Sequence, residues 1–157
     1  MDYYLILIHI ISATVWTGGH LVMAIGFLPK AISLGAPQLL NDFESVYEKI
    51  GIPALFIQII TGVLLGYNYF SSFLDFFGFS TYHQFLLTLK FLLLGLTVVL
   101  ALDARLRIIP KLGHQNLRAL AWHIFPISII SVLYIVVGVS FKNEGFLYGV
   151  FALLQNN

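Results

Sequence analysis

The stretch YYLILIHIISATVWTGGHLVMAIGFL, residues Tyr3–Leu28, decides the fold, because it is long and apolar enough to cross a bilayer as a helix. It carries two histidines, His9 and His20, eleven residues apart. At about 100° and 1.5 Å per residue, eleven helical steps make three turns plus about 20°, so both imidazoles leave one helix face about 16 Å apart. Ionisable side chains inside a membrane span are costly and are functional candidates by default. We therefore take His9 and His20 as the first candidate ligands.

The composition is that of an integral membrane protein. The chain has 157 residues, of which 59% are hydrophobic and 10% charged, and its mean hydropathy is +0.93. A soluble domain would carry about 25% charged residues. The absence of cysteine excludes disulfides and thiolate metal sites, and the two methionines, Met1 and Met23, offer little to a copper path of soft ligands. The length suits a single domain, residues 1–157, and the net charge of +1 gives no indication of a nucleic-acid partner.

Four segments are long and apolar enough to span the membrane. They are residues 3–28, 53–70, 85–102 and 119–141. They must be helices, because the alternation of a membrane barrel is missing and lipid leaves the backbone no other way to satisfy its polar groups. A fifth apolar piece, residues 145–154, is too short to cross. We predict an all-α, four-helix membrane bundle with a short C-terminal interfacial or bundle-packing segment.

The basic residues predict the orientation. The first connection holds Lys30 and Lys49, and the third holds four further basic residues between 105 and 118, whereas the second, residues 71–82, has none. By the positive-inside rule, the first and third connections face the cytoplasm and both termini face outward. We therefore expect a multi-pass protein of a bacterial inner membrane with both termini in the periplasm.

This orientation assigns the ionisable side chains to two levels. His9 lies in the outer half, His83 at the outer boundary, and Lys90 about 10 Å deeper than His83 on the same helix face. His20 and His123 lie together in the inner half. Each level thus offers candidate ligands from different helices, which is the arrangement of a b-type heme held across a four-helix bundle. His9, His20, His83 and His123 are the candidate metal ligands.

Two roles can be assigned to Lys90, and two to Trp16. No Asp or Glu within any predicted span neutralises Lys90. Its ammonium either snorkels to the outer interface or pairs with an anion that is not part of the protein, such as a heme propionate or an acidic substrate. Trp16 lies on the stripe of His9 and His20 and either walls a porphyrin or fills space. His114 fits neither level and is expected to be a solvated loop residue.

Several short motifs resemble a known family. The run Ile8–Gly19, with a histidine followed by Trp-Thr-Gly-Gly, resembles the opening helix of the CopD copper-resistance domain family. Leu89–Leu96 and Ala101–Pro110 are similar to that family's lysine-bearing helix and its basic exit. The same frame resembles HemJ-type membrane protoporphyrinogen oxidases, whose first-helix histidine and third-helix lysine match His9 and Lys90. Two histidines depart from the HemJ pattern: His20, and His123 in the segment Trp122–Pro126. Both fall on the inner level.

These observations favour a heme b membrane protein. We expect a transmembrane electron-transfer cytochrome with one or two hemes, in which His20 and His123 ligate the inner heme, and His9 with His83 or Lys90 forms the outer site. A quinone or a redox protein would be its partner, and association between copies is left open. Three alternatives remain. The HemJ resemblance implies protoporphyrinogen IX oxidation, the CopD resemblance implies copper transport, and a structural subunit would bind no cofactor.

Overall fold

The computed structural model describes residues 2–113, 115–143 and 145–155, and every regular element in this part of the chain is helical. His114 lies outside the described residues. The elements are α1 (Asp2–Val22), the π-helix η1 (Met23–Phe27), α2 (Leu28–Leu34), α3 (Gln38–Gly66), the 3-10 helix η2 (Phe73–Phe76), α4 (Tyr82–Asp103), the π-helix η3 (Ala104–Ile108), the 3-10 helix η4 (Ile109–Lys111), α5 (Leu117–Val139) and α6 (Gly145–Gln155). The predicted all-α fold is confirmed.

Four helical rods are long and apolar enough to cross a membrane. They run over residues 3–34, 38–66, 82–111 and 117–139. The first joins α1, η1 and α2 without a break and ends at Gly35, whose φ of 58° is the left-handed conformation that closes many helices. The chain is therefore a multi-pass membrane protein with four spans, as predicted.

The second rod begins much earlier than the predicted span at residue 53. Residues 38–52 are helical although they carry Asp42, Glu44, Glu48 and Lys49, and Pro53 lies inside α3. Twenty-nine helical residues extend about 44 Å, whereas the hydrocarbon core is about 30 Å thick. The charged first turns thus have room to project beyond the hydrocarbon. There Arg105 of η3 lies 2.8 Å from Glu48 and 3.5 Å from Glu44, which ties α4 to α3.

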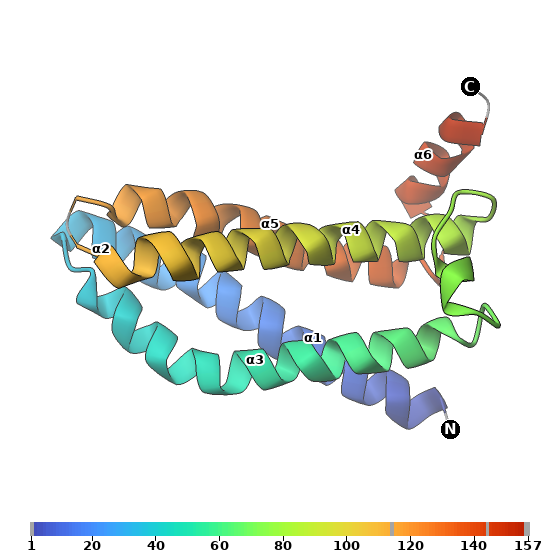
Figure 1. Cartoon of the computed structure of the whole chain (residues 1–157), viewed down its shortest axis with the longest axis horizontal. Coiled ribbons are helices and arrows are strands. Elements are labelled where there is room, and N and C mark those ends of the chain that lie inside the picture. The colour runs from blue at the N-terminus through green and yellow to red at the C-terminus, as the bar shows by residue number, and fades with distance from the viewer. Residues whose placement is uncertain (1, 114, 144, 156–157) are drawn as a thin grey trace.

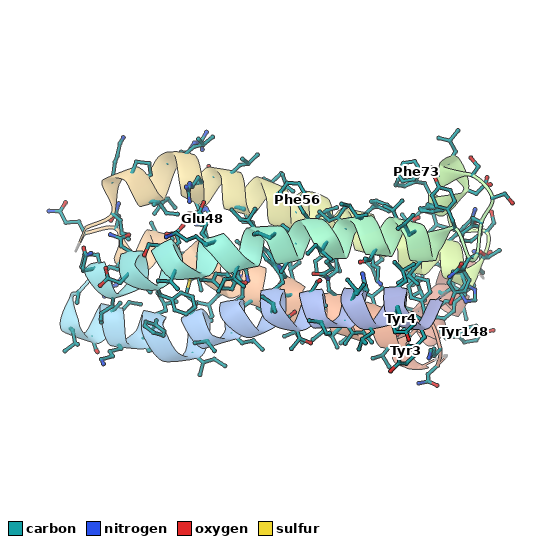
Figure 2. The ribbon with its side chains drawn as sticks, turned by 90° about the horizontal axis from the view of Figure 1, so that it is seen from below. Tyr3, Tyr4, Glu48, Phe56, Phe73 and Tyr148 are labelled. Atoms are coloured by element: carbon teal, nitrogen blue, oxygen red, sulfur yellow. The ribbon has the colours of Figure 1, made fainter. Side chains whose placement is uncertain are left out.

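Both ends of the bundle are well defined in Figure 1. The two termini lie at one end, which we call the terminal end, and α2 lies at the other, which we call the basic end. Figure 2 places Tyr3, Tyr4, Phe73 and Tyr148 at the terminal end and Glu48 towards the basic end. The aromatic side chains form the kind of belt that marks a membrane interface. Which end faces the cytoplasm stays a prediction.

The helices pack unequally. α1 packs most extensively against α3, and α5 packs against both α4 and α1, whereas α3 and α4 make few contacts with each other. Small polar residues tie α1 to α5: Thr17 Oγ1 donates to Ser131 O at 3.2 Å, and Ser128 Oγ lies 3.1 Å from His20 O. Such close contacts are typical of membrane helices. α3 and α4 thus lie apart, and the cavity described below lies between them, α1 and α5.

The C-terminal helix α6 packs on the terminal end of α4 and leans away from the bundle (Figure 1). Leu147 is buried against the α4 and α5 core, and the Phe151 ring lies 5.7 Å from that of Phe85. The helix is too short to cross a membrane. This agrees with the prediction of a short C-terminal segment that does not cross the membrane and packs on the bundle.

Candidate functional site

A cavity of about 560 Å³ lies in the terminal half of the bundle, between α1, α3, α4 and α5. Most of its wall is apolar. Its polar lining residues are His9, Thr14, Gln58, Asn68, Tyr69, Lys90, Tyr134, Lys142 and Asn143. Two of the predicted site residues, His9 and Lys90, thus share one cavity, as expected from their common outer level.

His9 is held by α3 in a defined orientation. Its Nδ1 lies 2.9 Å from Thr61 Oγ1, and Gly62 lets the ring lie close, since a Cβ there would be 3.2 Å from Cε1. Thr61 Oγ1 also lies 2.6 Å from the carbonyl of Ile57. Because a hydroxyl has a single hydrogen, Thr61 donates it to Ile57 O and accepts from His9 Nδ1–H. The unprotonated Nε2 is then the nitrogen that can ligate a metal, and Thr61 is its orienting partner.

Lys90 reaches the terminal end of the cavity. Its Nζ lies 4.8 Å from the centre of the Phe141 ring, in the turn that follows α5. Gly138 faces the same ammonium, since a Cβ at that residue would be 3.9 Å from Nζ. Within the described residues Lys90 has no carboxylate partner. The long stem therefore does snorkel towards the interface, yet it stays in the cavity wall.

His83 lies behind the cavity wall instead of in it. Its ring stacks on Tyr69 at 4.5 Å with an interplanar angle of 24°, and it lies 5.9 Å from the Phe141 ring. Tyr69 and Phe141 line the cavity, and His83 does not. The predicted outer group of His9, His83 and Lys90 is thus only partly assembled, with aromatic rings between His83 and the other two.

One buried polar atom of a residue in the cavity wall, Gln58 Oε1, has no hydrogen-bond partner among the described residues. Gln58 is only 9% exposed. A buried polar atom without a partner is costly. The hydroxyl of Tyr134, which also lines the cavity, interacts with Thr97 of α4.

His20 and Trp16 form a separate buried cluster with Tyr47 of α3. Trp16 and His20 rings lie 4.3 Å apart. His20 Nδ1 lies 2.9 Å from Trp16 O, which also accepts a hydrogen bond from Tyr47 Oη at 2.8 Å. His9 and His20 thus both contact α3, which agrees with their predicted common face. Trp16 packs on His20 and is not part of the cavity wall.

His123 does not meet His20. Its Nε2 lies 2.9 Å from Asp103 Oδ2 on α4, and its Nδ1 lies 3.0 Å from Ala119 O. His20 contacts α5 at Ser128, and five helical residues separate the directions of His123 and Ser128 by about 140°. The two histidines therefore point to different neighbouring helices, and both His123 nitrogens already face oxygen atoms. The predicted His20–His123 ligand pair is not formed, because rotation about α5 separates residues at the same depth.

Thr61, Gln58, Tyr134 and Asp103 were not predicted to belong to any site. Gln58 and Thr61 are polar residues three apart in an apolar span, which is a signal that the sequence does contain. Asp103 lies just beyond the predicted third span, residues 85–102, and the sequence gives no indication of its contact with His123. Within the described residues, no group of three or more His, Cys, Asp or Glu side chains could hold a metal ion.

The fold and the cavity define a multi-pass helical membrane protein with a partly polar chamber between its spans. The sequence matches the family described as Copper resistance protein D over residues 42–141, and the chain belongs to that family. The match begins within α3, covers α4 and α5, and leaves α1, with His9 and His20, outside it. Neither a curated protein nor a solved structure matches the chain.

Proposed function

We propose that this protein handles copper in the membrane, as a carrier or a transport component, with His9 as a ligand in the cavity. The family match carries this proposal. The hydrogen bond from His9 to Thr61 supports it, because it leaves Nε2 free to bind a metal. Imidazole is a good copper ligand, and the wall adds amide and phenol oxygens instead of thiol or thioether groups.

The copper proposal is tested by metal content. Cells expressing the protein should accumulate copper, and the purified protein should bind it, whereas His9→Ala should lose most of that binding. His83→Ala is the matched control, since His83 lies at the same end of the bundle but outside the cavity wall. Equal copper binding by His9→Ala and the parent protein would contradict the proposal.

A second candidate is the binding of one heme b in the same cavity. Lys90 favours it, because the cavity wall holds this cation and no Asp or Glu, and a propionate would neutralise it. His9 would be the iron ligand, and bound heme would supply electron transfer. A second, inner heme is not proposed, because His20 and His123 point to different helices. The quinone or protein redox partner stays a prediction.

An absorption spectrum separates the two candidates. A Soret band that is present in the parent protein and absent from His9→Ala would support heme. Its retention in His123→Ala would agree with a single site in the cavity. Protoporphyrinogen oxidation, which the HemJ resemblance implies, would be tested by rescue of a strain that lacks that activity and by loss of rescue with Lys90→Gln.

A further inference from the structure

We propose that the cavity binds an amphipathic anion from the surrounding bilayer, with Lys90 as the partner of its anionic group. The shared chemistry is a carboxylate or phosphate carried on an apolar chain. This proposal does not rest on copper or heme binding. It rests on the charge of the wall, on the depth of Lys90 and on the apolar lining that α3 and α4 supply.

The charge of the cavity wall is entirely positive. Two lysines, Lys90 and Lys142, line it, and none of its lining residues is acidic. An ammonium removed from water needs a compensating anion or strong hydrogen bonds. Within the described residues, the Lys90 ammonium lies over the face of Phe141, which is a weaker partner than a carboxylate or phosphate. An anion that is not part of the chain would complete this site.

The polar groups place the anionic head at the terminal end. The Lys90 ammonium lies between Gly138, in the last turn of α5, and the ring of Phe141, which follows that helix. Asn68, Lys142 and Asn143 line the same end of the cavity. A lipid keeps its headgroup at the interface and its chain in the hydrocarbon, and the lysine stem spans this boundary in the same direction.

The apolar part of the cavity would hold the chain of such a ligand. Leu55 and Ile59 of α3 face Leu87, Phe91 and Leu94 of α4 across the cavity. Because α3 and α4 make few contacts with each other and the cavity lies between them, the apolar chain would lie between these two helices. The cavity of about 560 Å³ is within the range of sites for small amphipathic molecules.

The experiment is native mass spectrometry of the purified chain with three probes: oleate, phosphatidylglycerol and phosphatidylcholine. We expect the two anionic probes to bind about tenfold or more tightly than the zwitterionic one, since hydrogen bonds to charged groups are worth about 1.5–3 kcal/mol and 1.4 kcal/mol is a factor of ten. Comparison of oleate with phosphatidylglycerol identifies the source of the anion. Equal binding of all three probes would overturn the proposal.

Variants locate the site. Lys90→Gln should lose the preference for anionic probes, and Lys90→Arg should keep it. Lys30→Gln, at the basic end and outside the cavity, should behave like the parent protein. Leu94→Trp should weaken all binding by filling the apolar part. An anionic preference that survives Lys90→Gln, or porphyrin retained at one molecule per chain in place of lipid, would overturn the proposal, while loss of copper binding in His9→Ala would leave it intact.

Discussion

Thr61 determines which nitrogen of His9 is available as a ligand. Its hydroxyl donates to Ile57 O and accepts from His9 Nδ1–H. In Thr61→Val the shape is kept and the acceptor is lost. We expect copper affinity, measured by titration of the purified protein, to fall about 10–100-fold, as is usual when the partner of a ligating histidine is removed.

The matched control for this prediction is Thr97→Val. Thr97 is a buried threonine of α4 whose hydroxyl donates to Leu93 O, and it is not part of the cavity wall. It should leave copper affinity unchanged. An equal loss in Thr61→Val and Thr97→Val would mean that His9 is not oriented in the way described.

Gly18 and Gly19 are adjacent in α1, but only Gly19 is in close contact with another helix. A Cβ at Gly19 would lie 2.0 Å from the ring of Tyr47, whereas a Cβ at Gly18 has nothing within 4 Å. We expect Gly19→Ala to destabilise the protein by about 1–3 kcal/mol through overpacking. Gly18→Ala should be neutral or stabilising by up to about 1 kcal/mol, because alanine favours the helix. Thermal unfolding in detergent measures both, and a lower midpoint for Gly18→Ala than for Gly19→Ala would contradict this packing.

The candidate site could be predicted only in part from individual residues. Helix geometry and depth predicted one level for His9 and Lys90, and both line one cavity, because depth depends only on distance along an axis. They could not assign His83 or His123 to a neighbour. The neighbour of a side chain depends on how its helix is rotated about its axis. In this protein the rotation brings His83 against Tyr69 and Phe141, and it brings His123 against Asp103.

The π-helix η1 was not predicted from the sequence. Its geometry allows a specific test by deletion of single residues. A π turn holds one residue more than an α turn. Deleting Ile25, which is 74% exposed, should let η1 close as an α-helix and keep Leu28 and Ala31 in the core. Deleting Ile11, 55% exposed in regular α1, should instead rotate one part of the helix by about 100° against the other.

These two deletions are compared by expression level and by size-exclusion profile in detergent. The Ile25 deletion should yield a folded, monodisperse protein, whereas the Ile11 deletion should be lost or aggregated. The reverse order would show that the π geometry does not hold the register between α1 and α2.

Four spans could be predicted from hydropathy alone, because bilayer thickness imposes a minimum apolar length. The start of α3 could not, since its charged residues are typical of a loop. They lie in a helix, in which Glu44 and Glu48 pair with Arg105 of the neighbouring span. The boundaries of a membrane helix therefore depend on the tertiary partners of its polar end. A hydropathy average over the sequence contains no information on these partners.

At the scale of the whole molecule, the lysines and arginines are concentrated at the basic end. Six of the eight lysines and arginines lie at or near the basic end, and the two exceptions, Lys90 and Lys142, line the cavity. The terminal end holds both chain termini (Figure 1), and the cavity reaches this end at Asn68, Lys142 and Asn143. The positive-inside rule then predicts that the basic end is cytoplasmic and that the cavity lies towards the opposite side.

Because the chain has no cysteine, single cysteines can test this orientation without a background. Ser71→Cys and Asn143→Cys lie at the terminal end, and Ala36→Cys and Asn116→Cys lie in the connections of the basic end. A membrane-impermeant maleimide applied to intact spheroplasts should label the first pair, and it should label the second pair only after permeabilisation. Labelling of the second pair alone in intact spheroplasts would reverse the orientation and would place the cavity towards the cytoplasm.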